Sequence, residues 1–159
     1  MKLEDISITE GGIDWQRCLQ PWAWLLKEKP EFNIWIVTKF GEIFVTDDSG
    51  SIWFISTSNG SYEKIAESKE SFANSLENPE RVEYYFMPKL VRNLEENLGK
   101  LNKGQCYGFH VPCFFKECTF EVDNFKIIDI EKYLIGLGEM LGKLQAIPDG
   151  AKVSFNVVE

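Results

Sequence analysis

Four short runs of β-branched and aromatic residues follow one another in the first half of the chain, and turn residues separate them. The runs cover residues 34–40, 42–46, 52–57 and 62–65. Their composition predicts β-strands. Asp47-Asp48-Ser49-Gly50 follows the second run and offers a glycine for a left-handed position, and Asn59-Gly60 after the third run is a strong hairpin signal. The pattern therefore predicts an antiparallel β-meander.

Both faces of this predicted sheet carry apolar side chains. Ile43 and Val45 lie on one face, whereas Phe44 lies on the other. A sheet with one face in water alternates apolar and polar residues more strictly. We therefore expect both faces to be covered. The cover is either the protein's own helices and C-terminal segment or, on one face, a partner bound to an aromatic surface.

Apolar residues at helical spacing flank the predicted sheet on both sides in the sequence. Before it, Asp14 is a suitable N-cap for a helix that Pro21 interrupts and that ends before Pro30. After it, we expect three helices, within 68–76, 79–86 and 88–98, and then two or three strands within 105–111 and 120–130. A helix that follows Asp129 is expected within 130–148, and an edge strand within 151–158. This order predicts a single α+β domain over residues 1–159, in which an antiparallel meander sheet packs with several helices.

The last predicted helix contains three glycines, each of which costs a helix about 1 kcal/mol relative to alanine. Two of them, Gly138 and Gly142, are four residues apart and share one face. We interpret this face as a place where a bulky side chain or a backbone segment packs closely. Packing within the protein is favoured over a groove for a partner.

The balance of acidic and basic residues indicates which class of partner the protein can bind. The chain has 17 basic and 25 acidic residues, a formal net charge of −8. Direct DNA or RNA binding is disfavoured, because it requires a cationic surface that displaces counterions. An acidic surface suits a basic protein partner, although acidity that only maintains solubility accounts for the same charge. There is no leader pattern at the N-terminus and no apolar run of about 20 residues, so we expect a cytoplasmic protein with reduced cysteines.

Candidate chemistry is sparse. His110 is the only histidine, no nucleophile signature surrounds it, and the chain has no phosphate-binding loop. We therefore expect no enzyme activity and no cofactor. One alternative stays open: Cys106, His110, Cys113 and Cys118 supply the ligand types that tetrahedral zinc prefers. Their spacing matches no short zinc knuckle, and cysteine is often buried as a small hydrophobic residue.

Four segments carry a resemblance to a known family, in the same order along the chain. They are residues 40–57, Tyr85-Phe86-Met87-Pro88, Gly104-Gln105-Cys106-Tyr107-Gly108-Phe109 and Ile128-Asp129-Ile130-Glu131-Lys132-Tyr133. They resemble the C-terminal domain of immunity proteins paired with type VI secretion DNase effectors, long catalogued as a domain of unknown function. The resemblance covers about residues 15–155. We expect the N-terminal domain of the two-domain members to be absent, because only about 14 residues precede the first predicted helix.

The resemblance implies a non-catalytic immunity protein that binds a cognate toxin, which we expect to be a basic nuclease, and blocks its activity. The acidic turn and the aromatic residues near it are the predicted contact surface, namely Glu42, Phe44, Asp47, Asp48 and Trp53. Two alternatives stay open. One is a regulatory or scaffold module that binds a cellular protein or a small ligand, and the other is an enzyme or zinc protein centred on His110.

Overall fold

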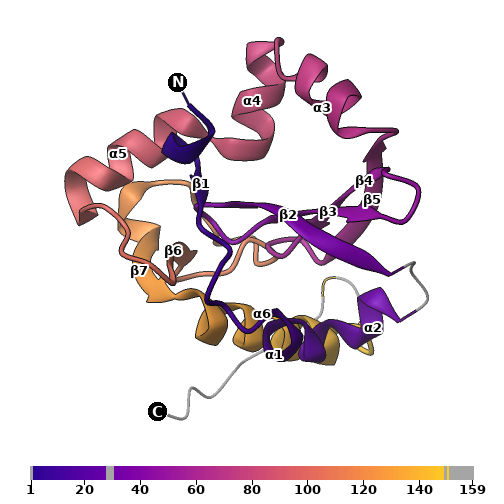
Figure 1. Ribbon diagram of the computed structural model, residues 1–159. Helices are drawn as coiled ribbons and strands as arrows, with labels where there is room; N and C mark the ends of the chain where they lie inside the picture. The colour runs from indigo at the N-terminus through magenta and orange to yellow at the C-terminus, as the bar shows by residue number, and fades with distance from the viewer. Residues whose placement is uncertain (1, 28–30, 149, 151–159) are drawn as a thin grey trace.

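The computed structural model describes residues 2–27, 31–148 and 150. A five-stranded antiparallel sheet lies between two layers of helices, and a separate two-stranded hairpin lies beside it (Figure 1). Helices α1, α2 and α6 cover one face of the sheet, and α3, α4 and α5 lie on the other side. The predicted α+β class, with an antiparallel meander packed by several helices, is confirmed.

The large sheet has the strand order β1-β2-β3-β4-β5, and every neighbouring pair is antiparallel. Its strands are β1 (Ser7–Ile8), β2 (Phe32–Thr38), β3 (Ile43–Asp47), β4 (Ile52–Ser56) and β5 (Ser61–Ala66). Gly50 and Gly60 adopt positive φ angles of 81° and 74° in the two turns where the sequence predicted left-handed glycines. These turns let β4 pair with β3 on one side and β5 on the other, as the meander prediction requires.

The segment before the sheet consists of short helical turns, η1 (Leu3–Asp5), α1 (Trp15–Leu19), η2 (Gln20–Trp22) and α2 (Ala23–Leu26). The Asp14 side chain accepts a hydrogen bond from the Arg17 backbone N–H and caps α1. Pro21 lies inside the 3-10 turn η2, because its ring and missing N–H disfavour a continuous α-helix. The predicted cap and interruption are both confirmed.

The second helical layer consists of α3 (Lys69–Ser75), α4 (Pro79–Phe86) and α5 (Pro88–Leu98). The Ser68 and Asn78 side chains cap the first two helices by accepting hydrogen bonds from backbone N–H groups. Met87 alone separates α4 from α5, and its φ of 47° places it in the left-handed region that side chains rarely adopt. The chain therefore changes direction at a single residue between two helices.

The C-terminal part begins with β6 (Gln105–Phe109), η3 (Val122–Asn124) and β7 (Phe125–Asp129), and ends with α6 (Ile130–Leu144). The strand predicted over 120–130 is shorter in the structure, because 122–124 form a 3-10 turn. Asp129 caps α6 by accepting a hydrogen bond from the Lys132 N–H, as predicted. The edge strand predicted for 151–158 lies outside the described residues.

Apolar side chains form three buried clusters that account for the two apolar faces of the sheet. One cluster joins the Val45 face to Trp22 and to Leu134 of α6, and a second joins the Phe44 face to α3 and α4. The third packs the β6–β7 hairpin against α5. The protein's own helices cover both faces, so the alternative of an aromatic face left open for a partner is wrong.

The glycine face of α6 packs against the tryptophans of the N-terminal turns. A Cβ atom at Gly138 would lie 2.7 Å from Trp22 Nε1, and one at Gly142 would lie 3.0 Å from Trp24 Cδ1. Trp22 Nε1 also donates a hydrogen bond of 2.9 Å to the Leu134 carbonyl. The prediction of internal close packing on this face is confirmed.

Candidate functional site

The structure buries two of the five residues predicted to contact a partner. Glu42 is only 7% exposed, and its Oε2 and Oε1 accept hydrogen bonds of 2.7 and 3.3 Å from the backbone N–H groups of Thr57 and Ser58. Burial raises the pKa of the Glu42 carboxyl, although hydrogen bonds from Ser58 and Thr57 oppose the shift. Glu42 thus ties the β2–β3 turn to the β4–β5 turn.

Phe44 is fully buried under the second helical layer. Its ring lies 5.0 Å from that of Phe72 and 5.3 Å from that of Phe86, measured between centroids. A partner reaches neither Phe44 nor Glu42 unless the fold opens. These two positions are therefore corrected from predicted contacts to residues of the interior, because adjacent helices and turns cover them.

The other three predicted residues lie together at the turn between β3 and β4. Asp47 Oδ2 accepts a hydrogen bond of 2.9 Å from Trp53 Nε1, and its Oδ1 accepts from the N–H groups of Ser49 and Ser51. The bond from Trp53, with those from Ser51 and Ser49, holds the pKa of Asp47 below its usual value. The Asp47 carboxylate is therefore used by hydrogen bonds within the turn. Trp53 is half-buried and Asp48 is exposed. Partner contact at this turn stays a prediction.

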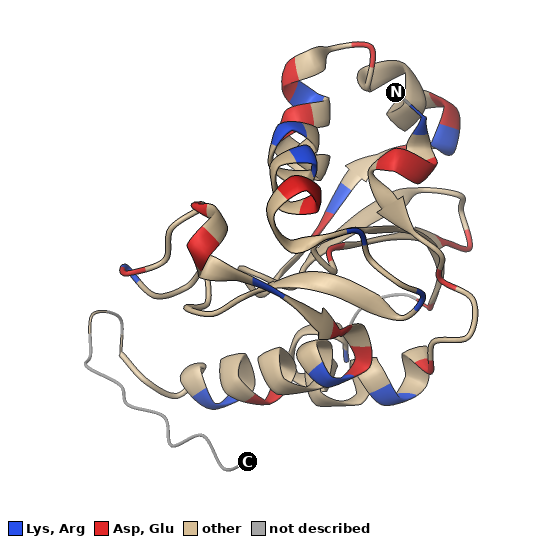
Figure 2. Cartoon of the chain, turned by 90° about the vertical axis from the view of Figure 1, so that its left-hand side faces the viewer, with Lys and Arg blue, Asp and Glu red and all other residues tan. Residues whose placement is uncertain are grey.

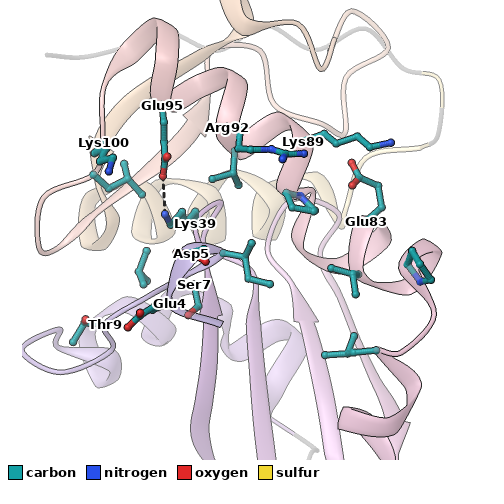
Figure 3. Close-up of a pocket in the computed structure, with 18 of the residues that line it drawn as sticks. Glu4, Asp5, Ser7, Thr9, Lys39, Glu83, Lys89, Arg92, Glu95 and Lys100 are labelled. Atoms are coloured by element: carbon teal, nitrogen blue, oxygen red, sulfur yellow. Dashed lines mark hydrogen bonds and ion pairs between the residues drawn. The ribbon is translucent and has the colours of Figure 1, made fainter. Parts of the chain in front are cut away.

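A large groove, which no sequence pattern indicated, lies away from the β3–β4 turn. It has a volume of about 1300 Å³ and lies between the N-terminal segment 4–9, helices α4 and α5, and residues 100–104. Half-buried Leu76, Val82 and Leu101 are among the apolar residues that line it. Charged side chains from several elements line it as well (Figure 3). The lining segments are far apart in the sequence, so only the tertiary fold reveals the groove.

Charges of both signs line this groove. The acidic ones are Glu4, Asp5, Glu77, Glu80, Glu83 and Glu95, and the basic ones are Lys39, Lys89, Arg92, Lys100 and Lys103. Lys39 Nζ lies 2.8 Å from Glu95 Oε1, and both side chains are mostly buried, at 13% and 22% exposure. This ion pair connects the end of β2 to α5. The helical layer above the sheet carries both signs of charge (Figure 2).

The four residues of the zinc alternative do not converge in the structure. Cys106 is fully buried on β6, whereas His110 is exposed just after that strand. Cys113 and Cys118 interact in the loop between the hairpin strands, and burial raises the pKa of Cys113 to about 11. Within the residues that the structure describes, no group of three or more His, Cys, Asp or Glu side chains could hold a metal ion. The four residues do not form a ligand set here.

A comparison with known protein families tests the resemblance that the sequence motifs indicated. A family model described as T6SS immunity protein Tdi1, C-terminal, matches residues 66–141. The family resemblance is confirmed. The match begins at the end of β5 and ends within α6. It covers just under half of the 159-residue chain. For residues 15–65 and 142–155 the resemblance stays a prediction. No curated protein matches the chain.

The matched Tdi1 segment contains helices α3, α4 and α5, the β6–β7 hairpin and most of α6. It includes most of the groove lining but not the β3–β4 turn. Among the described residues, no helix has both the length and the apolar character needed to cross a membrane. The family supports an immunity role in type VI secretion.

Proposed function

We propose that this protein is a cytoplasmic immunity protein that binds a cognate type VI secretion effector and blocks its activity without catalysis. The match of residues 66–141 to the Tdi1 C-terminal family carries this proposal. A folded inhibitor acts by covering the active site of its target or by holding the target in an inactive shape. Neither mechanism needs a nucleophile or a cofactor in the inhibitor.

We further propose that the effector is a nuclease with a basic surface. The net charge of −8 supports this, because an enzyme that binds a polyanion presents positive charge. Complementary charge accelerates association, and salt screens this effect over roughly 10 Å at 0.1 M ionic strength. We therefore expect the association rate to fall as salt rises, while the dissociation rate changes less.

The test is to search the genes beside the one for this protein for a type VI secretion toxin, and to measure protection of bacteria that express it. Co-expression of the full chain is expected to restore growth, and the purified chain is expected to suppress cleavage of DNA by the toxin. An unrelated acidic protein of similar charge is the control for nonspecific binding. If the chain neither protects cells nor binds the toxin, the immunity function is refuted, and a reproducible cellular partner would then indicate a regulatory module.

A further inference from the structure

We propose that the groove between the N-terminal segment and helices α4 and α5 is the main binding surface for the effector, and that it takes up one protruding polypeptide segment of that protein. This inference rests on the proposed immunity function and deepens it, because it names the surface and the kind of segment. It also departs from the sequence-based prediction that placed the contact at the β3–β4 turn.

The composition of the groove is that of a protein interface. Half-buried apolar residues such as Leu76, Val82 and Leu101 lie among the lining residues, together with charged ones. Protein interfaces combine an apolar centre with a polar rim in this way. The volume of about 1300 Å³ accommodates several side chains of a partner. A second hollow, between α1 and the start of β2, has about half this volume, at about 640 Å³.

The rim charges are arranged by sign, and this arrangement defines the segment. Lys89 and Arg92 project from α5 on one side, and Glu4 and Asp5 lie across the groove from them (Figure 3). Glu83 of α4 lies beside Lys89 and adds a third carboxylate to the rim (Figure 3). A segment that fits has an apolar stripe with basic side chains along one edge and acidic side chains along the other.

Four of the groove charges are available to a partner. Among the ion pairs of the described residues, the one that joins two groove residues is Lys39–Glu95, and none involves Glu80, Glu83, Arg92 or Lys100. A partner therefore pairs with these four residues without first breaking an internal ion pair, whereas Glu4 already lies 3.9 Å from Lys2 Nζ. Such complementary pairs contribute to specificity and to the rate of association.

The groove is preformed. The left-handed conformation of Met87 sets the angle between α4 and α5, and the Lys39–Glu95 pair holds α5 to the end of β2. A preformed site loses less conformational entropy when a partner binds. Apart from segment 4–9 and Lys39, every lining residue also lies within the segment that matches the Tdi1 family. Asp47, Asp48 and Trp53 lie outside it.

The experiment measures binding of the full chain to a catalytically inactive form of the neighbouring toxin, and protection of cells against the active form. The acidic side is reversed in Glu80→Lys/Glu83→Lys, and the basic side in Arg92→Glu/Lys100→Glu. The control, Glu70→Lys/Glu96→Lys, changes the net charge of the chain as much as the acidic-side variant, at exposed helix positions that do not line the groove. Asp48→Lys tests the β3–β4 turn.

We expect each groove variant to weaken binding by about tenfold or more, which corresponds to about 1.4 kcal/mol, and to lose protection. The control and Asp48→Lys are expected to bind within about threefold of the wild type. Circular dichroism and thermal melting verify that all variants fold. The groove proposal is overturned if both folded groove variants bind normally, or if Asp48→Lys alone loses binding. The immunity function stands in either case. A wild-type chain that does not bind the toxin overturns both proposals.

Discussion

Two glycines on α6 provide a matched pair of substitutions with opposite expected effects. A Cβ atom at Gly136 meets no heavy atom within 4 Å, whereas one at Gly138 would lie 2.7 Å from Trp22 Nε1 and 2.9 Å from Pro21 Cβ. Both positions are inside the same helix, so the change in helix propensity is equal. The difference between Gly136→Ala and Gly138→Ala therefore isolates the packing against Trp22.

The magnitudes follow from the local contacts. Replacing glycine with alanine inside a helix stabilises it by about 1 kcal/mol, and Gly136→Ala is expected to show this gain. At Gly138 the added methyl group overpacks the interface, at a cost of about 1–3 kcal/mol. It also displaces Trp22 from its hydrogen bond to the Leu134 carbonyl, which costs about 1 kcal/mol more. The net result for Gly138→Ala is a destabilisation of about 1–3 kcal/mol.

Urea unfolding followed by far-ultraviolet circular dichroism measures both variants against the wild type. We expect the two free energies of unfolding to lie about 2–4 kcal/mol apart, with Gly136→Ala the more stable. Thermal melts should differ in the same direction, because 1 kcal/mol shifts the midpoint by about 2–4 °C in a domain near this size. Equal stabilisation by both substitutions would refute the close approach of Trp22 to α6.

Three further outcomes concern buried charges and are measured by urea unfolding. Glu42→Ala leaves the Thr57 and Ser58 N–H groups without an acceptor, and we expect a loss of about 2–4 kcal/mol. Because burial raises the folded-state pKa of Glu42 above 4.5, the folded protein binds this proton more tightly. The wild type should therefore gain stability relative to Glu42→Gln as the pH falls through the folded pKa towards 4.5, and a difference that is independent of pH would contradict this. Lys39→Met leaves Glu95 partly buried without its cation and should cost about 1–3 kcal/mol, whereas the exposed Lys89→Met should cost much less.

Local signals in the sequence were sufficient to predict most of the fold. The turn glycines, the Asp14 and Asp129 caps and the break at Pro21 each depend on neighbouring residues alone. The alternation around Phe44 predicted two covered faces but could not show what covers them. That answer required knowing that α3 and α4 pack on one face and α6 on the other, which involves residues distant in sequence.

The predictions that needed correction depend on long-range contacts. Glu42 next to Gly41 resembles an exposed turn residue in sequence, but the β4–β5 turn closes over its carboxylate. The strand expected from residue 120 starts only at Phe125, because the Asn124 side chain bonds to both the N–H and the carbonyl of Val111 and holds a turn there. The groove has no local signal, since segments 4–9 and 76–104 form it together.

The single-residue corner at Met87 has a consequence for how this surface can change over evolutionary time. Because α4 and α5 meet there without a loop, the frame of the groove is fixed by the backbone, and exposed rim residues such as Glu80 and Arg92 contribute little to the core. Substitutions at such exposed positions usually alter stability by less than about 0.5 kcal/mol. The recognition surface can therefore diversify residue by residue to follow a changing toxin, while the scaffold that presents it stays the same.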